Sequence, residues 1–90
     1  MKHAELPGGD LVASGLEDLA RGVESVPALL VSVGAPRLRR LGVLVPGTLP
    51  DAEHRLYARL AADEPDAAHS RYNALIRRLV SFERAAACGS

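Results

Sequence analysis

Aromatic residues are scarce in this chain of 90 residues, which has no tryptophan, one phenylalanine and two tyrosines. Aromatic side chains normally supply a large share of the apolar area that a small core buries. The apolar residues are mainly 15 Ala, 14 Leu and 8 Val. A domain of this size buries only about 60% of the surface of its unfolded chain. We therefore expect it to gain buried area by forming a homodimer or by docking on another protein.

The chain also has only one cysteine, no net charge and no long apolar run. Cys88 is the only cysteine, so the chain cannot form an internal disulfide or a cysteine-rich zinc site. The formal net charge is zero, which argues against attraction of the whole domain to nucleic acid or to an anionic membrane. The longest uncharged stretch, residues 25–36, falls short of the roughly 20 residues that span a bilayer.

The first residues and the amino-acid composition indicate where the protein is located and what kind of organism it comes from. Lys2 and His3 are followed by an acid and a proline instead of the apolar run of a secretory signal. Ten arginines against one lysine, together with the many alanines, are typical of a GC-rich genome. The sequence therefore predicts a cytoplasmic bacterial protein that does not contact a membrane.

Residues 1–9 contain a proline and two glycines and are expected to form a flexible start, so that residues 10–88 make a single helical domain. Asp10 can cap a first helix, whose apolar residues recur at helical spacing to about Glu24. Gly15 lies inside this predicted helix and should weaken it by up to about 1 kcal/mol relative to alanine.

The middle of the chain allows two predictions. Residues 28–33 are almost wholly apolar and follow a proline suited to a first helical turn, so we expect a short buried helix that Gly34 and Pro36 end. A separate helical turn would then occupy residues 36–41. The alternative is an α+β fold with a short hairpin at residues 29–45, because periodicity cannot distinguish helix from strand over so short a run.

The last two helices are the most clearly marked. Thr48 and Asp51 have the spacing of a capping box, and the helix that they start should run to about Ala62. The acids and proline of residues 63–66 start a final helix that meets no glycine or proline before Gly89. This helix would have about 23 residues and a length of roughly 35 Å. The predicted fold is a compact all-α domain of four helices with a long C-terminal helix.

An apolar seam with flanking arginines marks the final helix. Apolar residues recur there at alternating spacings of four and three, as in a heptad repeat, and the central ones are Tyr72, Leu75, Leu79 and Phe82. We predict that these four residues form either the core or an interface, since interfaces favour tyrosine and arginine. The arginines that would orient a partner there are Arg71, Arg77, Arg78 and Arg84.

A basic segment supports a different prediction, nucleic-acid binding. Residues 27–41 can be drawn as helix, turn and helix, a layout that loosely resembles a helix-turn-helix. Arg37, Arg39 and Arg40 would lie on the second helix and contact the nucleic acid. That helix would be barely two turns long, and its leucines must face inward, so few side chains remain to read bases.

One further polar group of residues lies on the final helix. His69, Asn73 and Arg77 align at i, i+4 and i+8 and could hold a phosphate or a partner's carboxylate. The sequence has no metal-ligand spacing, nucleophile motif or phosphate-binding loop. We therefore predict a non-enzymatic helical interaction or dimerisation module that needs no cofactor and no metal.

Overall fold

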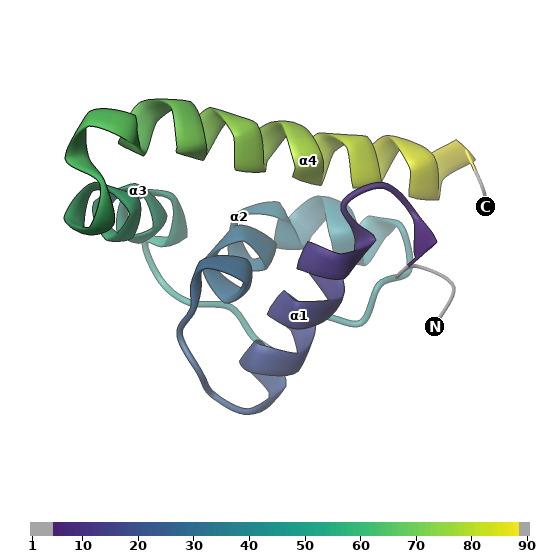
Figure 1. Cartoon of the computed structure of the whole chain (residues 1–90). Coiled ribbons are helices and arrows are strands. Elements are labelled where there is room, and N and C mark those ends of the chain that lie inside the picture. The colour runs from purple at the N-terminus through teal and green to yellow at the C-terminus, as the bar shows by residue number, and fades with distance from the viewer. Residues whose placement is uncertain (1–4, 89–90) are drawn as a thin grey trace.

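The computed structural model describes residues 5–88, which form four α-helices and one short 3₁₀ helix (Figure 1). The elements are α1 (Gly9–Ala20), α2 (Val26–Arg40), α3 (Ala52–Asp63), η2 (Pro65–Ala67) and α4 (Ala68–Cys88). The predicted all-α fold of four helices is confirmed. The alternative hairpin at residues 29–45 is wrong, since no strand forms within residues 5–88. Residues 1–4 of the predicted flexible start lie outside the described residues.

The first helix begins and ends at different residues from those predicted. Its N-cap is Gly8, with a φ of 73°, and Asp10 lies in the first turn, where its charge complements the helix dipole. The helix ends at Ala20 instead of near Glu24. Gly22, with a φ of 69°, reverses the chain there in the left-handed conformation that glycine adopts readily.

The predicted break in the second helix at Gly34 and Pro36 is wrong, because α2 runs unbroken through both residues to Arg40. Pro36 removes one backbone hydrogen bond, at a cost of about 3 kcal/mol in a helix interior. Continuing the helix buries Ala35 and Leu38 completely or almost so, and this burial offsets the cost. The helix-turn-helix drawn at residues 27–41 therefore does not exist as two helices.

The second helix lies at the centre of the fold. It packs against α1, α3 and α4, and α4 extends across the other helices from the end of α3 to the start of α1 (Figure 1). Fully buried leucines of α2 and α3 meet Phe82 of α4 in one continuous core. The largest fully buried side chains are Phe82, Leu29, Leu30, Leu38, Leu56 and Leu60.

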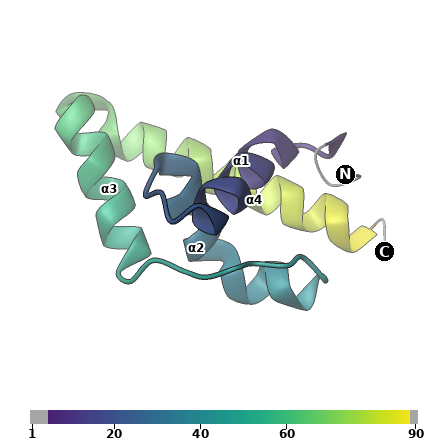
Figure 2. The same ribbon diagram turned by 90° about the horizontal axis from the view of Figure 1, so that it is seen from below.

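A long loop at residues 41–51 returns the chain along α2 to the start of α3 (Figure 2). The hydroxyl of Ser32 organises it, because Ser32 Oγ accepts a hydrogen bond from the backbone N–H of Leu49 at 3.0 Å. The predicted capping box at Thr48 is wrong: α3 begins at Ala52, and its N-cap is Asp51, with a φ of 52° and no side-chain cap. Residues 43–49 form neither helix nor turn, so Thr48 comes too early to cap the helix.

The last helix is the long element that the sequence predicts. The 3₁₀ turn of η2 leads into it, and α4 then continues without interruption to Cys88. Neither α4 nor any other helix within residues 5–88 has both the length and the hydropathy of a membrane-spanning segment.

Candidate functional site

The apolar seam of α4 faces the interior of the domain. Leu79 is 4% exposed and Phe82 is fully buried, while Tyr72 and Leu75 are half-buried against the same core. The ring of Tyr72 packs at 56° on the ring of Tyr57 of α3, with the centroids 5.8 Å apart. The seam is therefore occupied by this chain's own helices, and a partner surface has to be sought elsewhere.

The end of α3 and the start of α4 are held together near Tyr72 by polar and charged groups. Burial, together with the negative charge of Glu53, raises the pKa of the Tyr72 phenol above its ordinary value. The Arg71 guanidinium donates hydrogen bonds to Asp63 Oδ2 at 2.8 Å and to Glu64 Oε1 at 3.1 Å. Arg71 therefore ties α4 to the end of α3, and the partner-orienting role predicted for it stays a prediction.

Another of the arginines singled out on α4 also pairs with an acid of this chain. The Arg78 guanidinium donates to Asp10 Oδ1 at 2.9 Å and so joins α4 to the start of α1. Arg77 and Arg84 are exposed, and no ion pair forms between either of them and an acid within residues 5–88. Among the described residues, two of the four flanking arginines, Arg71 and Arg78, therefore pair with acids of this chain, and the other two form no ion pair.

The Arg78→Gln variant is expected to raise the pKa of the Asp10 carboxyl toward its ordinary value of 3.8. Desolvation acts to raise this pKa in the wild-type chain, but the backbone N–H of Leu11 and the charge of Arg78 outweigh it and lower the pKa. Because the folded-state pKa is depressed, the pair stabilises the fold above the unfolded-state pKa and loses this contribution as the pH falls through the folded-state pKa.

The difference in unfolding free energy between wild type and Arg78→Gln should therefore narrow below about pH 4. Urea titrations at a series of pH values measure this difference, and NMR titration of the Asp10 carboxyl measures the pKa directly. A difference that persists undiminished into acid would contradict the role of the ion pair.

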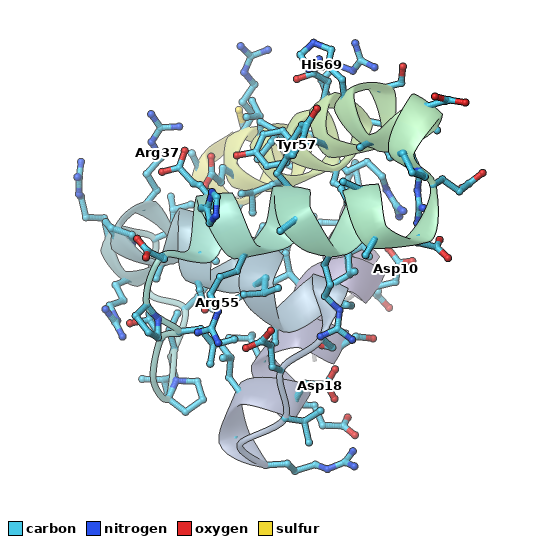
Figure 3. The ribbon with its side chains drawn as sticks, turned by 90° about the vertical axis from the view of Figure 1, so that its left-hand side faces the viewer. Asp10, Asp18, Arg37, Arg55, Tyr57 and His69 are labelled. Atoms are coloured by element: carbon cyan, nitrogen blue, oxygen red, sulfur yellow. The ribbon has the colours of Figure 1, made fainter. Side chains whose placement is uncertain are left out.

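The polar residues His69, Asn73 and Arg77 are exposed on the outer side of α4, where His69 points away from the other helices (Figure 3). The Asn73 amide and the His69 ring are hydrogen-bonded to each other, with Nδ2 and Nε2 3.2 Å apart. No cluster of three or more His, Cys, Asp or Glu residues that could hold a metal ion occurs in the described part of the chain.

Arg37, Arg39 and Arg40 are all exposed on the last turns of α2, but their contacts differ. Arg39 donates to the backbone oxygen of Val45 at 3.4 Å, and Arg37 lies 3.6 Å from a carboxylate oxygen of Glu83. Arg40 has no ion pair with an acid among residues 5–88.

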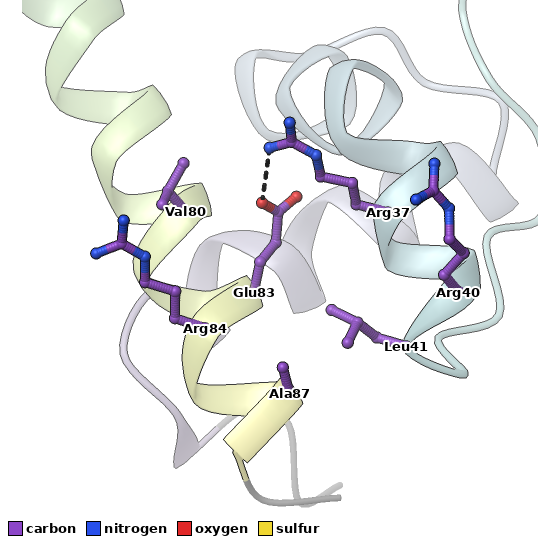
Figure 4. Close-up of a pocket in the computed structure, with 7 residues that line it drawn as sticks. All are labelled: Arg37, Arg40, Leu41, Val80, Glu83, Arg84 and Ala87. Atoms are coloured by element: carbon purple, nitrogen blue, oxygen red, sulfur yellow. Dashed lines mark ion pairs between the residues drawn. The ribbon is translucent and has the colours of Figure 1, made fainter.

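A groove of about 460 Å³ lies between the end of α2 and the last turns of α4, and we call it the α2–α4 groove (Figure 4). It is lined by Arg37, Arg40 and Leu41 from the end of α2, and by Val80, Glu83, Arg84 and Ala87 from α4. The structure thus brings together three arginines that the sequence analysis placed in two unrelated predictions.

At the base of this groove lies Glu83, which the sequence analysis did not single out. It is only 8% exposed, and its buried Oε2 atom has no hydrogen-bond partner within residues 5–88. The signal was present in the sequence: Glu83 is four residues after Leu79 and next to Phe82, so it is a charged residue on the apolar face of the helix.

A second hollow, of about 600 Å³, lies between α1 and the loop that follows α2. Leu44, in that loop, is 89% exposed. We call this surface the α1–loop patch, and its lining residues are Ala13, Leu16, Glu17, Ala20, Leu44, Val45 and Pro46. The sequence analysis missed it, because Leu44 belongs to an apolar run whose neighbouring valines turn inward.

A scan against protein-family models finds no match for this chain, and searches of curated proteins and of solved structures find none either. Function is therefore inferred from the two surfaces described above.

Proposed function

We propose that the chain is a non-enzymatic helical interaction module that pairs with a second copy of itself through the α1–loop patch. The observation that carries this proposal is Leu44, a large apolar side chain that is 89% exposed beside an apolar hollow. Burying a leucine side chain is worth about 1.5–3 kcal/mol, and a symmetric dimer buries two of them. On the sequence grounds given above, we propose the bacterial cytoplasm as its location.

The shape of the patch favours a second copy as the occupant. A two-fold interface needs a surface that is complementary to itself. The α1–loop patch meets this need, because it has both a protruding side chain, Leu44, and a hollow beside Leu16 that can receive one. Its only charged residue, Glu17, is 3.5 Å from Arg21 of the same helix, so no unpaired charges of like sign would oppose each other.

The internal charge pairs also support an interaction module over an enzyme. Acids that a catalytic site could use are engaged in holding helices together. Glu24, for example, pairs with Arg55 at 2.9 Å and with Arg59 at 3.7 Å, which joins the start of α2 to α3.

The Leu44→Asp variant is expected to be a monomer under conditions where the wild-type chain is a dimer. The substitution places a charge at the centre of the interface, where it would be buried without a partner. The fold of each copy should be unaffected because Leu44 is exposed in the single chain. Light scattering on a sizing column measures the mass, and circular dichroism checks the helical content.

Val23→Asp is the matched control, because Val23 is also an exposed apolar residue but lies outside the patch. It should keep the mass of the wild type. A monomeric wild-type chain, or a Leu44→Asp variant that remains a dimer, would contradict self-association through this patch.

A further inference from the structure

Unpaired positive charge gathers at the α2–α4 groove of a chain whose formal net charge is zero. Among the arginines outside the groove, five pair with acids, as Arg71 does with Asp63 and Arg78 does with Asp10, whereas Arg39 and Arg77 form no ion pair within residues 5–88. Within residues 5–88, Arg40 and Arg84 form no ion pair, and Arg37 meets only Glu83, at 3.6 Å. A ligand that carries carboxylates would supply the missing partners through charge-assisted hydrogen bonds.

The groove also offers apolar surface and one buried acceptor. Leu41, Val80 and Ala87 lie between the arginines, so the site is suited to an apolar side chain as well as to anions. No group within residues 5–88 donates a hydrogen bond to the buried Oε2 atom of Glu83. A Cβ atom at Gly34 would lie 3.2 Å from this oxygen, so the glycine leaves the carboxylate its space between the two helices.

The groove continues along α4 into a neighbouring hollow of about 300 Å³, which shares Arg37, Arg40, Val80 and Glu83 with it. Ile76 lines this second hollow and Ala87 the first. These two residues are separated by roughly 16 Å along the helix axis, about three turns. An occupant of both hollows is therefore elongated, as a helical segment of a protein is.

We propose that the α2–α4 groove binds an acidic amphipathic helical segment of a partner protein. Carboxylates of the segment pair with Arg37, Arg40 and Arg84, while its apolar side chains cover Val80 and Leu41. Nucleic acid fits less well, since its uniform row of phosphates would face the Glu83 carboxylate and leave the apolar lining uncovered.

This proposal rests on the role as an interaction module but not on self-association. The α1–loop patch and the α2–α4 groove share no lining residue. The Leu44→Asp variant should therefore bind the acidic segment as the wild-type chain does, so that failure of one proposal can be distinguished from failure of the other.

The test uses a fluorescent synthetic peptide of about four helical turns, with leucines on one face and glutamate and serine on the other. Fluorescence anisotropy should show saturable binding that weakens with salt. The double variant Arg40→Glu, Arg84→Glu should weaken binding at least about tenfold, because attraction becomes repulsion at two sites. Both side chains are exposed, so circular dichroism should show an unchanged fold.

Two controls accompany this measurement. The Arg21→Glu variant reverses an exposed arginine on α1, remote from the groove, and should bind the peptide as the wild-type chain does. A second peptide, in which lysine replaces every glutamate, should not bind.

Several outcomes would overturn the proposal. One is the absence of saturable binding up to about 1 mM peptide, and another is equal affinity in the double variant. A duplex oligonucleotide that binds more tightly than the acidic peptide, and that the double variant no longer binds, would assign the groove to nucleic acid. A lower solution mass of the double variant than of the wild type would assign it to a second copy.

Discussion

The Gly15→Ala variant is expected to unfold at a lower temperature than the wild-type chain, although alanine is the better helix former. A Cβ atom at Gly15 would overlap the carbonyl oxygen of Pro27 and the Cγ2 atom of Val31. One of these groups belongs to the backbone and the other to a β-branched side chain, so neither can rotate away. The variant therefore has to separate α1 from α2, the most extensively packed pair of helices in the fold.

The two opposing effects differ in size. Alanine in place of glycine gains up to about 1 kcal/mol of helix propensity. Inserting extra atoms into a packed contact typically costs about 1–3 kcal/mol, and more where backbone has to move. Each net kcal/mol lowers the melting temperature of a domain of this size by about 4–8 °C. Thermal unfolding followed by circular dichroism measures this shift.

Gly47→Ala is the matched control for Gly15→Ala. A Cβ atom at Gly47 would meet no atom within 4 Å, so this variant should melt at or slightly above the temperature of the wild-type chain. If Gly15→Ala melted as high as Gly47→Ala, the close approach of α1 to α2 would not exist in solution.

The Phe82→Ala variant is expected to lose about 3–5 kcal/mol of unfolding free energy, the usual cost of truncating a fully buried phenylalanine. Phe82 is 0% exposed and is the largest side chain of the core. The chain has no other phenylalanine and no tryptophan, so this one side chain supplies the largest single share of the buried core. Against the total of about 5–15 kcal/mol that is typical of small domains, this loss should leave a large fraction of the chain unfolded under mild denaturing conditions.

Urea titration measures the loss, and Phe82→Leu is the informative comparison. Leucine keeps much of the apolar volume, and substitutions that nearly conserve volume usually cost less than about 1.5 kcal/mol. A Phe82→Ala variant as stable as Phe82→Leu would show that Phe82 does not fill the centre of the core.

Local patterns along the chain were enough to predict where α1, α3 and α4 lie, but not the full extent of α2. The heptad spacing in α4 and the absence of glycine and proline before Gly89 indicate one long helix, which is what forms. These signals are local, because helical periodicity depends on residues only three or four positions apart. The individual arginines of the α2–α4 groove were also singled out from the sequence, but not as members of one site.

The continuity of α2 and the role of Gly15 were decided only by the tertiary structure. From the sequence, Pro36 ends a helix and Gly15 weakens one. In the fold, Pro36 lies inside α2 because burial of Leu38 offsets its local cost, and Gly15 lets α1 approach α2. Both outcomes depend on a neighbouring helix, which local propensity does not include.

The sequence by itself thus determined that this chain is helical, where its long C-terminal helix lies and which residues carry charge. Only the tertiary structure decided which charges are left unmatched. Within residues 5–88, the fold pairs Arg71 and Arg78 with acids of this chain. It leaves Arg40 and Arg84 without an ion pair, on either side of the buried Glu83. The physical reason is that ion pairing depends on distance in space, and these partners are brought together by the packing of α4 on the other three helices.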